Sequence, residues 1–148
     1  MAPTEQRCVM YIFDGLMETQ ADDTELMPRL AAFRAGAARM RTHRPLFPCV
    51  TRGQAASMAT GCFPGTHGLH ANMSLLRGVS ENSGTECTHD SIAQQHAATG
   101  AGLLAPSMGE LLAEHGLQYW GLGSWTNGCA AVSIICTKQS PPQPDVQG

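Results

Sequence analysis

Short apolar runs alternate with amphipathic segments along the first half of the chain. Residues 8–13 (C-V-M-Y-I-F) form an unbroken apolar run that ends at Asp14-Gly15. A short run without polar alternation is typical of a strand covered on both faces, as in a parallel sheet. Residues 37–43 and 117–122 predict further strands. The pattern therefore predicts a sheet whose first strand brings Asp14 to its carboxyl end.

Three helices are expected between these strands. Thr24 is suited to cap a helix that Gly36 ends. A second, short helix is predicted over residues 52–60. The third begins after Ser107, because Ser107 and Glu110 have the spacing of a capping box. Strands that alternate with helices are typical of the α/β class.

In three stretches, the apolar residues follow neither the periodicity of a helix nor that of a strand. Residues 62–72 predict a tight loop, and the Ser-, Thr-, Gly- and Gln-rich residues 73–104 predict a long irregular segment. So long a loop inside a domain is usually functional. Residues 136–148 contain three prolines and no periodicity. They are interpreted as a disordered tail, or as sequence outside the fold.

Composition narrows the class of protein. The chain has 148 residues, 43% of them apolar, 14% charged and a net charge of −3, which indicates a globular protein without a basic surface for nucleic acid. We see neither a membrane-spanning run nor a secretory signal, and therefore expect a cytoplasmic protein. Six cysteines without a C-x-x-C pair indicate buried free thiols rather than disulfides or a zinc knuckle.

Three polar residues stand where an α/β enzyme places catalytic groups. Asp14 follows the first predicted strand, where it can ligate a metal ion. Thr51 precedes the helix at 52–60, whose free N–H groups suit a phosphate. Asn72 can donate its amide to a phosphoryl oxygen as charge builds. Because a hydroxyl is a weak nucleophile until a base or metal lowers its pKa, the set predicts metal-assisted phosphoryl transfer.

Each residue also has a purely structural interpretation. Asp14-Gly15 is a common turn, Thr51 can serve only as a helix cap, and Asn72 can simply form an Asx turn. From the spacing alone, both interpretations stay open.

Four ordered motifs resemble one enzyme family. They are F-D-G-L at 13–16, F-P-C-V-T-R at 47–52, A-T-G-C-F-P-G-T-H-G-L at 59–69, and Asn72. Together they resemble the start of a type I phosphodiesterase/nucleotide pyrophosphatase, of the alkaline phosphatase superfamily. The resemblance covers about residues 8–134. It implies that residues 1–135 are the N-terminal part of a catalytic domain, a three-layer α/β sandwich with a mostly parallel sheet.

The resemblance also implies roles. Asp14 would ligate one zinc ion, Thr51 would bind the same ion and form a phosphothreonine intermediate, and Asn72 would hold a phosphoryl oxygen. Members of the family use two zinc ions to stabilise the attacking and leaving oxygens. Small phosphate esters or nucleotides are the expected substrates.

Some positions depart from the family pattern. Cys49 stands where Thr or Ser is usual, and Gly53-Gln54 replaces a frequent Pro-Asn, which is expected to alter the substrate pocket. Arg52 is next to the nucleophile, where it can contact phosphate. We interpret it instead as a solvated surface side chain.

The family's remaining metal ligands, in D-x-x-x-H and D-H motifs, are not found. The spacing of Asp90 and His96 does not put both on one helix face, and neither the pair His89-Asp90 nor the pair His67 and His70 is a strong replacement. We therefore expect at most one partial zinc site in a truncated member of the family. A truncated sheet leaves an open edge, through which the chain is expected to self-associate.

Three functions are compatible with these observations. The first is hydrolysis of phosphodiester or nucleotide pyrophosphate bonds through a phosphothreonine. The second is a catalytically incompetent fragment or phosphate-binding module, which the missing ligands favour and which predicts no Thr51-dependent turnover. The third is a phosphomonoesterase, sulfatase or phosphonate hydrolase of the same superfamily. A threonine nucleophile and the block ending at Asn72 favour the diesterase branch.

Overall fold

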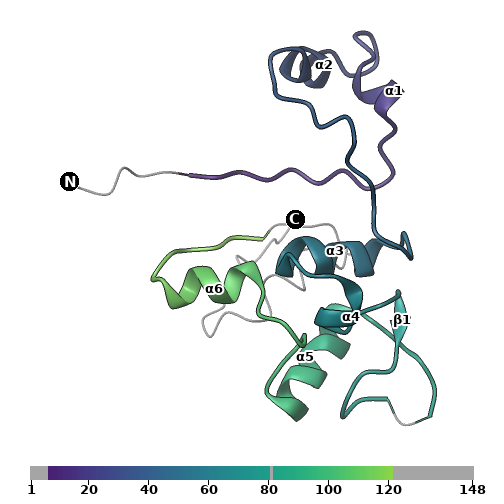
Figure 1. The fold of residues 1–148 in the computed structure, drawn as a ribbon, viewed down its shortest axis with the longest axis vertical. Coiled ribbons are helices and arrows are strands. Elements are labelled where there is room, and N and C mark those ends of the chain that lie inside the picture. Colours follow the sequence, from purple (N-terminus) through teal and green to yellow (C-terminus); the bar gives the residue numbers. More distant parts are fainter. Residues whose placement is uncertain (1–6, 81, 122–148) are drawn as a thin grey trace, which may run out of the picture. The chain divides into compact units, whose positions relative to one another are not determined.

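The computed structural model describes residues 7–80 and 82–121, which fall into two compact units, Met1–His43 and Arg44–Gly148 (Figure 1). The helices and strands, in chain order, are α1 (Glu18–Ala21), α2 (Pro28–Ala35), α3 (Thr51–Thr60), α4 (Pro64–His67), β1 (Met73–Ser74), β2 (Thr85–Glu86), α5 (His89–Thr99) and α6 (Met108–Glu114).

The Met1–His43 unit contains α1 and α2. The helix expected after Thr24 begins only at Pro28, because Asp23 Oδ1 accepts the backbone N–H groups two and three residues ahead, at 2.8 Å each. That turn holds the chain out of the helix, and Pro28 then occupies the first helical position, which it favours. Gly36 ends the helix as predicted.

Ion pairs rather than apolar packing connect the parts of this unit. Arg34 Nε lies 2.9 Å from Asp22 Oδ1, and Arg39 Nη2 lies 2.9 Å from Asp22 Oδ2 and 2.7 Å from Glu18 Oε1. Among the described apolar residues of the unit, only Ala21 and Ala31 are buried. Surface pairs contribute little singly, so the network matters chiefly because it joins α1, α2 and the segment that follows.

The strand predicted at residues 8–13 is absent. This segment pairs with no other described segment, and every side chain in residues 9–13 is at least 47% exposed. Residues 37–43 and 117–121 are likewise outside any strand. An apolar run becomes a strand only when another strand supplies its ladder of hydrogen bonds, and the sequence of the run does not show whether one does.

The sheet of the described residues consists of β1 and β2 alone. The two strands are antiparallel, with Met73 opposite Glu86 and Ser74 opposite Thr85. The described part is therefore a mixture of helices and a small sheet, compatible with the α/β class. The mostly parallel sheet of the predicted sandwich is not seen in it.

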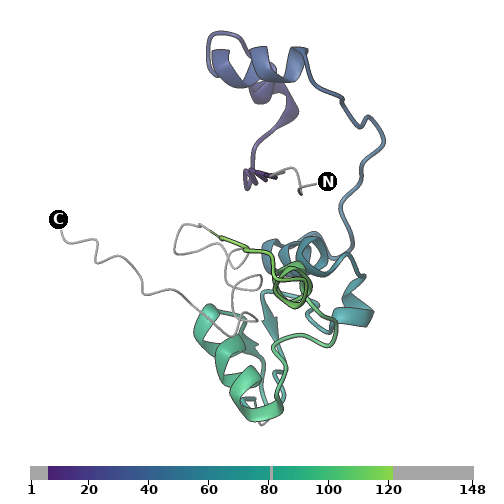
Figure 2. The same ribbon diagram turned by 90° about the vertical axis from the view of Figure 1, so that its left-hand side faces the viewer.

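The core of the Arg44–Gly148 unit lies around α3. This helix packs against α4 and α6 (Figure 1, Figure 2). Its buried alanines allow close approach to the apolar side chains of the loops and of α5; the core residues are Ala56, Ala59, Leu69, Leu76, Cys87, Ile92 and Leu103. Gly61, in the left-handed conformation at φ 67°, ends the helix directly after Thr60, the end of the predicted range.

The segment predicted to be irregular, residues 73–104, contains β1, β2 and α5. Reciprocal capping starts α5: Thr88 Oγ1 accepts from Ser91 N–H at 3.2 Å, and Ser91 Oγ accepts from Thr88 N–H at 2.9 Å. The interpretation as a long loop was wrong because this helix has few apolar residues, and hydrophobic periodicity was the signal sought.

The capping box predicted before α6 is confirmed. Ser107 Oγ accepts from Glu110 N–H at 3.3 Å, and Glu110 Oε2 accepts from Ser107 N–H at 2.6 Å. Within the described ranges, no helix has the length and apolar character needed to cross a bilayer. The predicted tail, residues 136–148, lies outside the described residues, and the boundary of a domain over residues 1–135 stays a prediction.

Candidate functional site

Thr51 is the first residue of α3, directly after the extended residue Val50. The side chain of Gln54, one turn along α3, fixes the segment that leads to it. Gln54 Nε2 donates to Leu46 O at 2.7 Å and to Pro48 O at 3.3 Å, while Gln54 Oε1 accepts from Leu46 N–H at 3.2 Å. Gln54, a departure from the family pattern, thus holds the backbone that carries Thr51.

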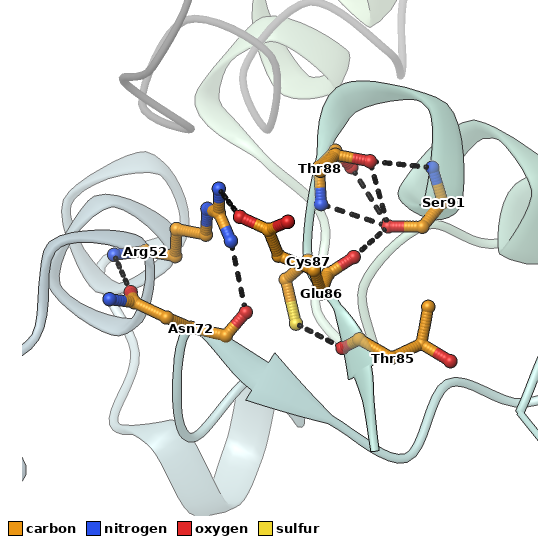
Figure 3. A network of polar contacts seen from close by, with 7 residues as sticks. All are labelled: Arg52, Asn72, Thr85, Glu86, Cys87, Thr88 and Ser91. Atoms are coloured by element: carbon orange, nitrogen blue, oxygen red, sulfur yellow. Dashed lines mark hydrogen bonds and ion pairs between the residues drawn. The ribbon is translucent and has the colours of Figure 1, made fainter. Parts of the chain in front are cut away.

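Asn72 is hydrogen-bonded to the first turn of α3 (Figure 3). Its side-chain Oδ1 accepts from the backbone N–H of Arg52 at 3.1 Å. Its backbone carbonyl accepts from Arg52 Nη1 at 3.0 Å and from Cys87 N–H at 2.8 Å. Two of the three predicted residues, Thr51 and Asn72, are therefore brought to the same helix terminus.

Arg52 is not the solvated surface side chain that we expected. Only 13% of its side chain is exposed, and its Nη2 lies 2.6 Å from Glu86 Oε1 (Figure 3). The expectation was wrong because Glu86 is 34 residues away in sequence and reaches Arg52 only through the β1–β2 pair.

Gly53 lets the chain come close to α3. A Cβ at this buried position would lie 3.4 Å from His70 O and 3.4 Å from Val50 Cγ2. A methyl group at that distance is in ordinary van der Waals contact, so only a side chain larger than that of alanine would press on the backbone that precedes Asn72. The small size of Gly53 therefore helps keep residues 70–72 close to the first turn of α3.

Asp14 lies in the Met1–His43 unit, in an exposed turn with Gly15 at φ 71°. The predicted turn is thus present. The site formed by Arg52, Asn72 and Glu86 belongs to the other unit, and the structure defines Asp14 within its own unit only.

Metal ligands do not gather in the described ranges. Among residues 7–80 and 82–121, no group of three or more His, Cys, Asp or Glu side chains could hold a metal ion. His89 Nδ1 and Asp90 Oδ1 lie 3.3 Å apart, on an exposed part of α5. A structural zinc ion usually takes four protein ligands and a catalytic one three, so this pair is too small a set.

The described cysteines are free thiols, as expected, but most are not buried. Cys8 and Cys49 are exposed, Cys62 is intermediate, and Cys87 alone of the four is buried. Burial raises the pKa of the Cys87 thiol. A thiol that keeps its proton is a poor metal ligand, so Cys87, though next to Glu86, belongs to the core.

Sequence reasoning missed Glu86 and the role of Gln54. Glu86 lies in the segment taken for an irregular loop, and no motif marks it. Gln54 was noted only as a difference from the family pattern. The position of Gln54, one turn after Thr51, could have indicated this role, because a side chain there can reach the backbone that precedes the helix.

Comparison with known proteins gives one match. The family model for type I phosphodiesterase / nucleotide pyrophosphatase matches residues 8–108. Searches of curated proteins and of solved structures found no significant match.

Proposed function

This chain belongs to the type I phosphodiesterase / nucleotide pyrophosphatase family, and from that premise we propose that it hydrolyses phosphodiester or nucleotide pyrophosphate bonds at the first turn of α3. The family acts on small phosphate esters or nucleotides. In our proposal Thr51 is the nucleophile and Asn72 the donor to a phosphoryl oxygen.

One observation supports this assignment above the others. Asn72 Oδ1 accepts the N–H of Arg52, the residue after Thr51. The oxygen of the amide is thereby engaged, and Nδ2 is the atom left to donate to a ligand. A donor beside a helix N-terminus is suited to an anion, because the helix adds partial positive charge.

The proposed reaction has two steps. The Thr51 hydroxyl attacks phosphorus, so that the Oγ–P bond forms while the P–O bond to the leaving group breaks; the hydroxyl proton passes to solvent or to the leaving oxygen. Water then cleaves the Oγ–P bond and restores Thr51. Asn72 Nδ2 stabilises the charge that grows on a phosphoryl oxygen in both steps.

The metal ions of the family need ligands from this chain. The family is generally metal-dependent, yet the described side chains do not by themselves fit a two-zinc centre. From the family motifs, we propose that Asp14 and Thr51 are each zinc ligands. Calorimetric titration with zinc tests this, because Asp14→Asn should then weaken binding while Asp23→Asn, also in an exposed turn, should not.

The scarcity of metal ligands in the part of the chain that the structure describes favours a second function, which is phosphate binding without hydrolysis. Thr51 and Asn72 would then hold a phosphate ester but would not cleave it. The two functions differ in turnover, not in the geometry of the phosphate site.

A zinc-supplemented assay with bis-p-nitrophenyl phosphate separates them. If the chain is a hydrolase, Thr51→Ala abolishes the release of p-nitrophenol, whereas Thr66→Ala, an exposed threonine on α4, leaves it unchanged. Phosphate binding without any release supports the second function. Release that Thr51→Ala does not reduce, or no binding and no release, contradicts the proposal.

A further inference from the structure

We propose that Arg52 and Glu86 are positioning residues, which aim the amide of Asn72 at the phosphate site and do not themselves contact the substrate. This inference rests on the proposed function, because it gives the Asn72 amide a direction that matters only if a phosphoryl oxygen binds there.

Arg52 holds Asn72 at both ends. Its backbone N–H binds Asn72 Oδ1 at 3.1 Å, and its Nη1 binds the Asn72 carbonyl at 3.0 Å. An asparagine side chain has only two rotatable bonds. Fixing the carbonyl and Oδ1 together therefore sets the plane of the amide and the direction of Nδ2.

Glu86 in turn holds Arg52. A guanidinium presents its donors in a rigid, planar fork, so one nitrogen can bind Asn72 O while the other binds a carboxylate. The Nη2–Oε1 distance of 2.6 Å is that of a charge-assisted hydrogen bond. A lysine, with a single ammonium group, would not reproduce this two-armed bridge.

The backbone of Glu86 is held by its neighbours (Figure 3). It lies on β2 opposite Met73, and its carbonyl accepts from Ser91 Oγ at 2.6 Å, at the start of α5. The next residue, Cys87, donates its N–H to Asn72 O at 2.8 Å. A continuous series of hydrogen bonds thus joins the start of α5 to Asn72.

The same contacts argue against Arg52 as a phosphate ligand. Its charge is already paired with Glu86, and only 13% of its side chain is exposed. A bound phosphate would have to compete with Glu86 for the positive charge of Arg52.

NMR spectroscopy of the full chain tests the inference in two measurements. The exchange rate of the Arg52 backbone N–H reports the bond to Asn72 Oδ1, and a titration with inorganic phosphate, followed at Asn72 Nδ2, reports the proposed site. Glu86→Gln keeps the size and loses the charge, and Arg52→Lys keeps the charge and loses the fork. Glu114→Gln and Arg77→Lys, at exposed positions of the same unit, are the matched controls.

We expect each site variant to speed exchange at Arg52 N–H by about fivefold and to weaken phosphate binding by about fivefold, since a hydrogen bond contributes about 1 kcal/mol. The controls should change neither. The free energy of unfolding of Glu86→Gln should stay near that of Glu114→Gln. This comparison distinguishes a misoriented Asn72 amide from a destabilised fold.

Three results would contradict the inference in distinguishable ways. If phosphate shifts the Asn72 amide equally in wild type and both variants, Arg52 and Glu86 do not position it, and the proposed function stands. If Arg52→Lys loses phosphate binding while exchange of the backbone N–H at position 52 is unchanged, Arg52 is a direct ligand. If phosphate leaves the wild-type amide unshifted, the proposed phosphate site is wrong, and the inference falls with it.

Discussion

His67 shows how a single buried side chain can fix both its own tautomer and its neighbours. Nδ1 accepts from Leu69 N–H at 3.2 Å, so the ring proton must be on Nε2, which lies 2.8 Å from Ser57 Oγ and donates to it. With 1% of its surface exposed, the ring joins α3 to the end of α4.

This arrangement predicts a stability that falls at acid pH. Burial, with a smaller contribution from His70, lowers the pKa of His67 from its ordinary 6.5. Above pH 6.5 the ring is neutral in both the folded and unfolded chain. Below it, the unfolded chain binds the proton first, so the free energy of unfolding falls with pH until the lowered pKa is reached, by at most about 1.4 kcal/mol per pH unit.

Urea unfolding at about pH 7.5 and about pH 5.5 measures this loss. His67→Gln can still hydrogen-bond to Ser57 but does not titrate, so its difference between the two pH values should be smaller than that of the wild type. Equal differences would show that other groups cause the loss.

The residues of the site differ in how far the sequence could predict them. Thr51 and Asn72 are marked by local motifs around a helix start and a turn. Glu86 is marked by nothing local, because its contact with Arg52 exists only once β1 and β2 pair. For the same reason, the role of Arg52 was misjudged.

At the level of elements, Gln54 joins α3 to the segment before it. Gln54→Ala removes three hydrogen bonds to the backbone of Leu46 and Pro48. We expect it to lower the free energy of unfolding by about 1–3 kcal/mol, since partly buried backbone groups lose their partners. Gln94→Ala, at an exposed position of α5, makes the same helical substitution and should change little. A loss equal to that of the control would mean that the three Gln54 hydrogen bonds do not stabilise the fold.

Gly78 determines how closely the turn after β1 approaches α5. It has φ 74°, and a Cβ there would lie 2.6 Å from Ala98 Cβ, whereas Gly61, at φ 67°, has open space around it. Gly61→Ala should cost about 1–2 kcal/mol for the left-handed backbone alone. Gly78→Ala should cost at least about 1 kcal/mol more, because methyl and backbone must move apart. Denaturant midpoints of the two variants give the difference, and equal midpoints would refute the close approach.

The elements that the sequence predicted well are those whose formation depends on residues close by in the sequence. Helix α3 has small residues and a terminal glycine, and α6 has its capping box, so each depends on neighbours within one turn. Residues 8–13 failed as a strand because a strand depends on a distant partner. Helix α5 was missed because its cap, Thr88 with Ser91, starts a mostly polar helix.

At the level of the whole molecule, the two units meet in sequence at an exposed segment. Arg41 is exposed in a turn between α2 and α3, close to the boundary at His43. Arg77 is also exposed, but its N–H binds Gln95 Oε1 at 2.7 Å inside a hydrogen-bonded turn. Limited digestion with trypsin should therefore cut after Arg41 before Arg77, because cleavage requires local opening.

Mass spectrometry of early digests identifies the product, a fragment that begins at Thr42 and retains α3 to α6. Arg44 is no competing site, since Pro45 follows it and trypsin spares such bonds. Simultaneous cleavage at Arg41 and Arg77 would show that the turn around Arg77 opens as readily as the segment between α2 and α3.

Ser57 beside His67 has a consequence for chemical proteomics. Fluorophosphonate reagents label serines whose proton a neighbouring imidazole withdraws. In this chain the imidazole gives its proton toward the serine instead, and Ser57 is only 8% exposed. A screen that sorts hydrolases by such labelling should therefore leave Ser57 unmodified, despite its histidine neighbour.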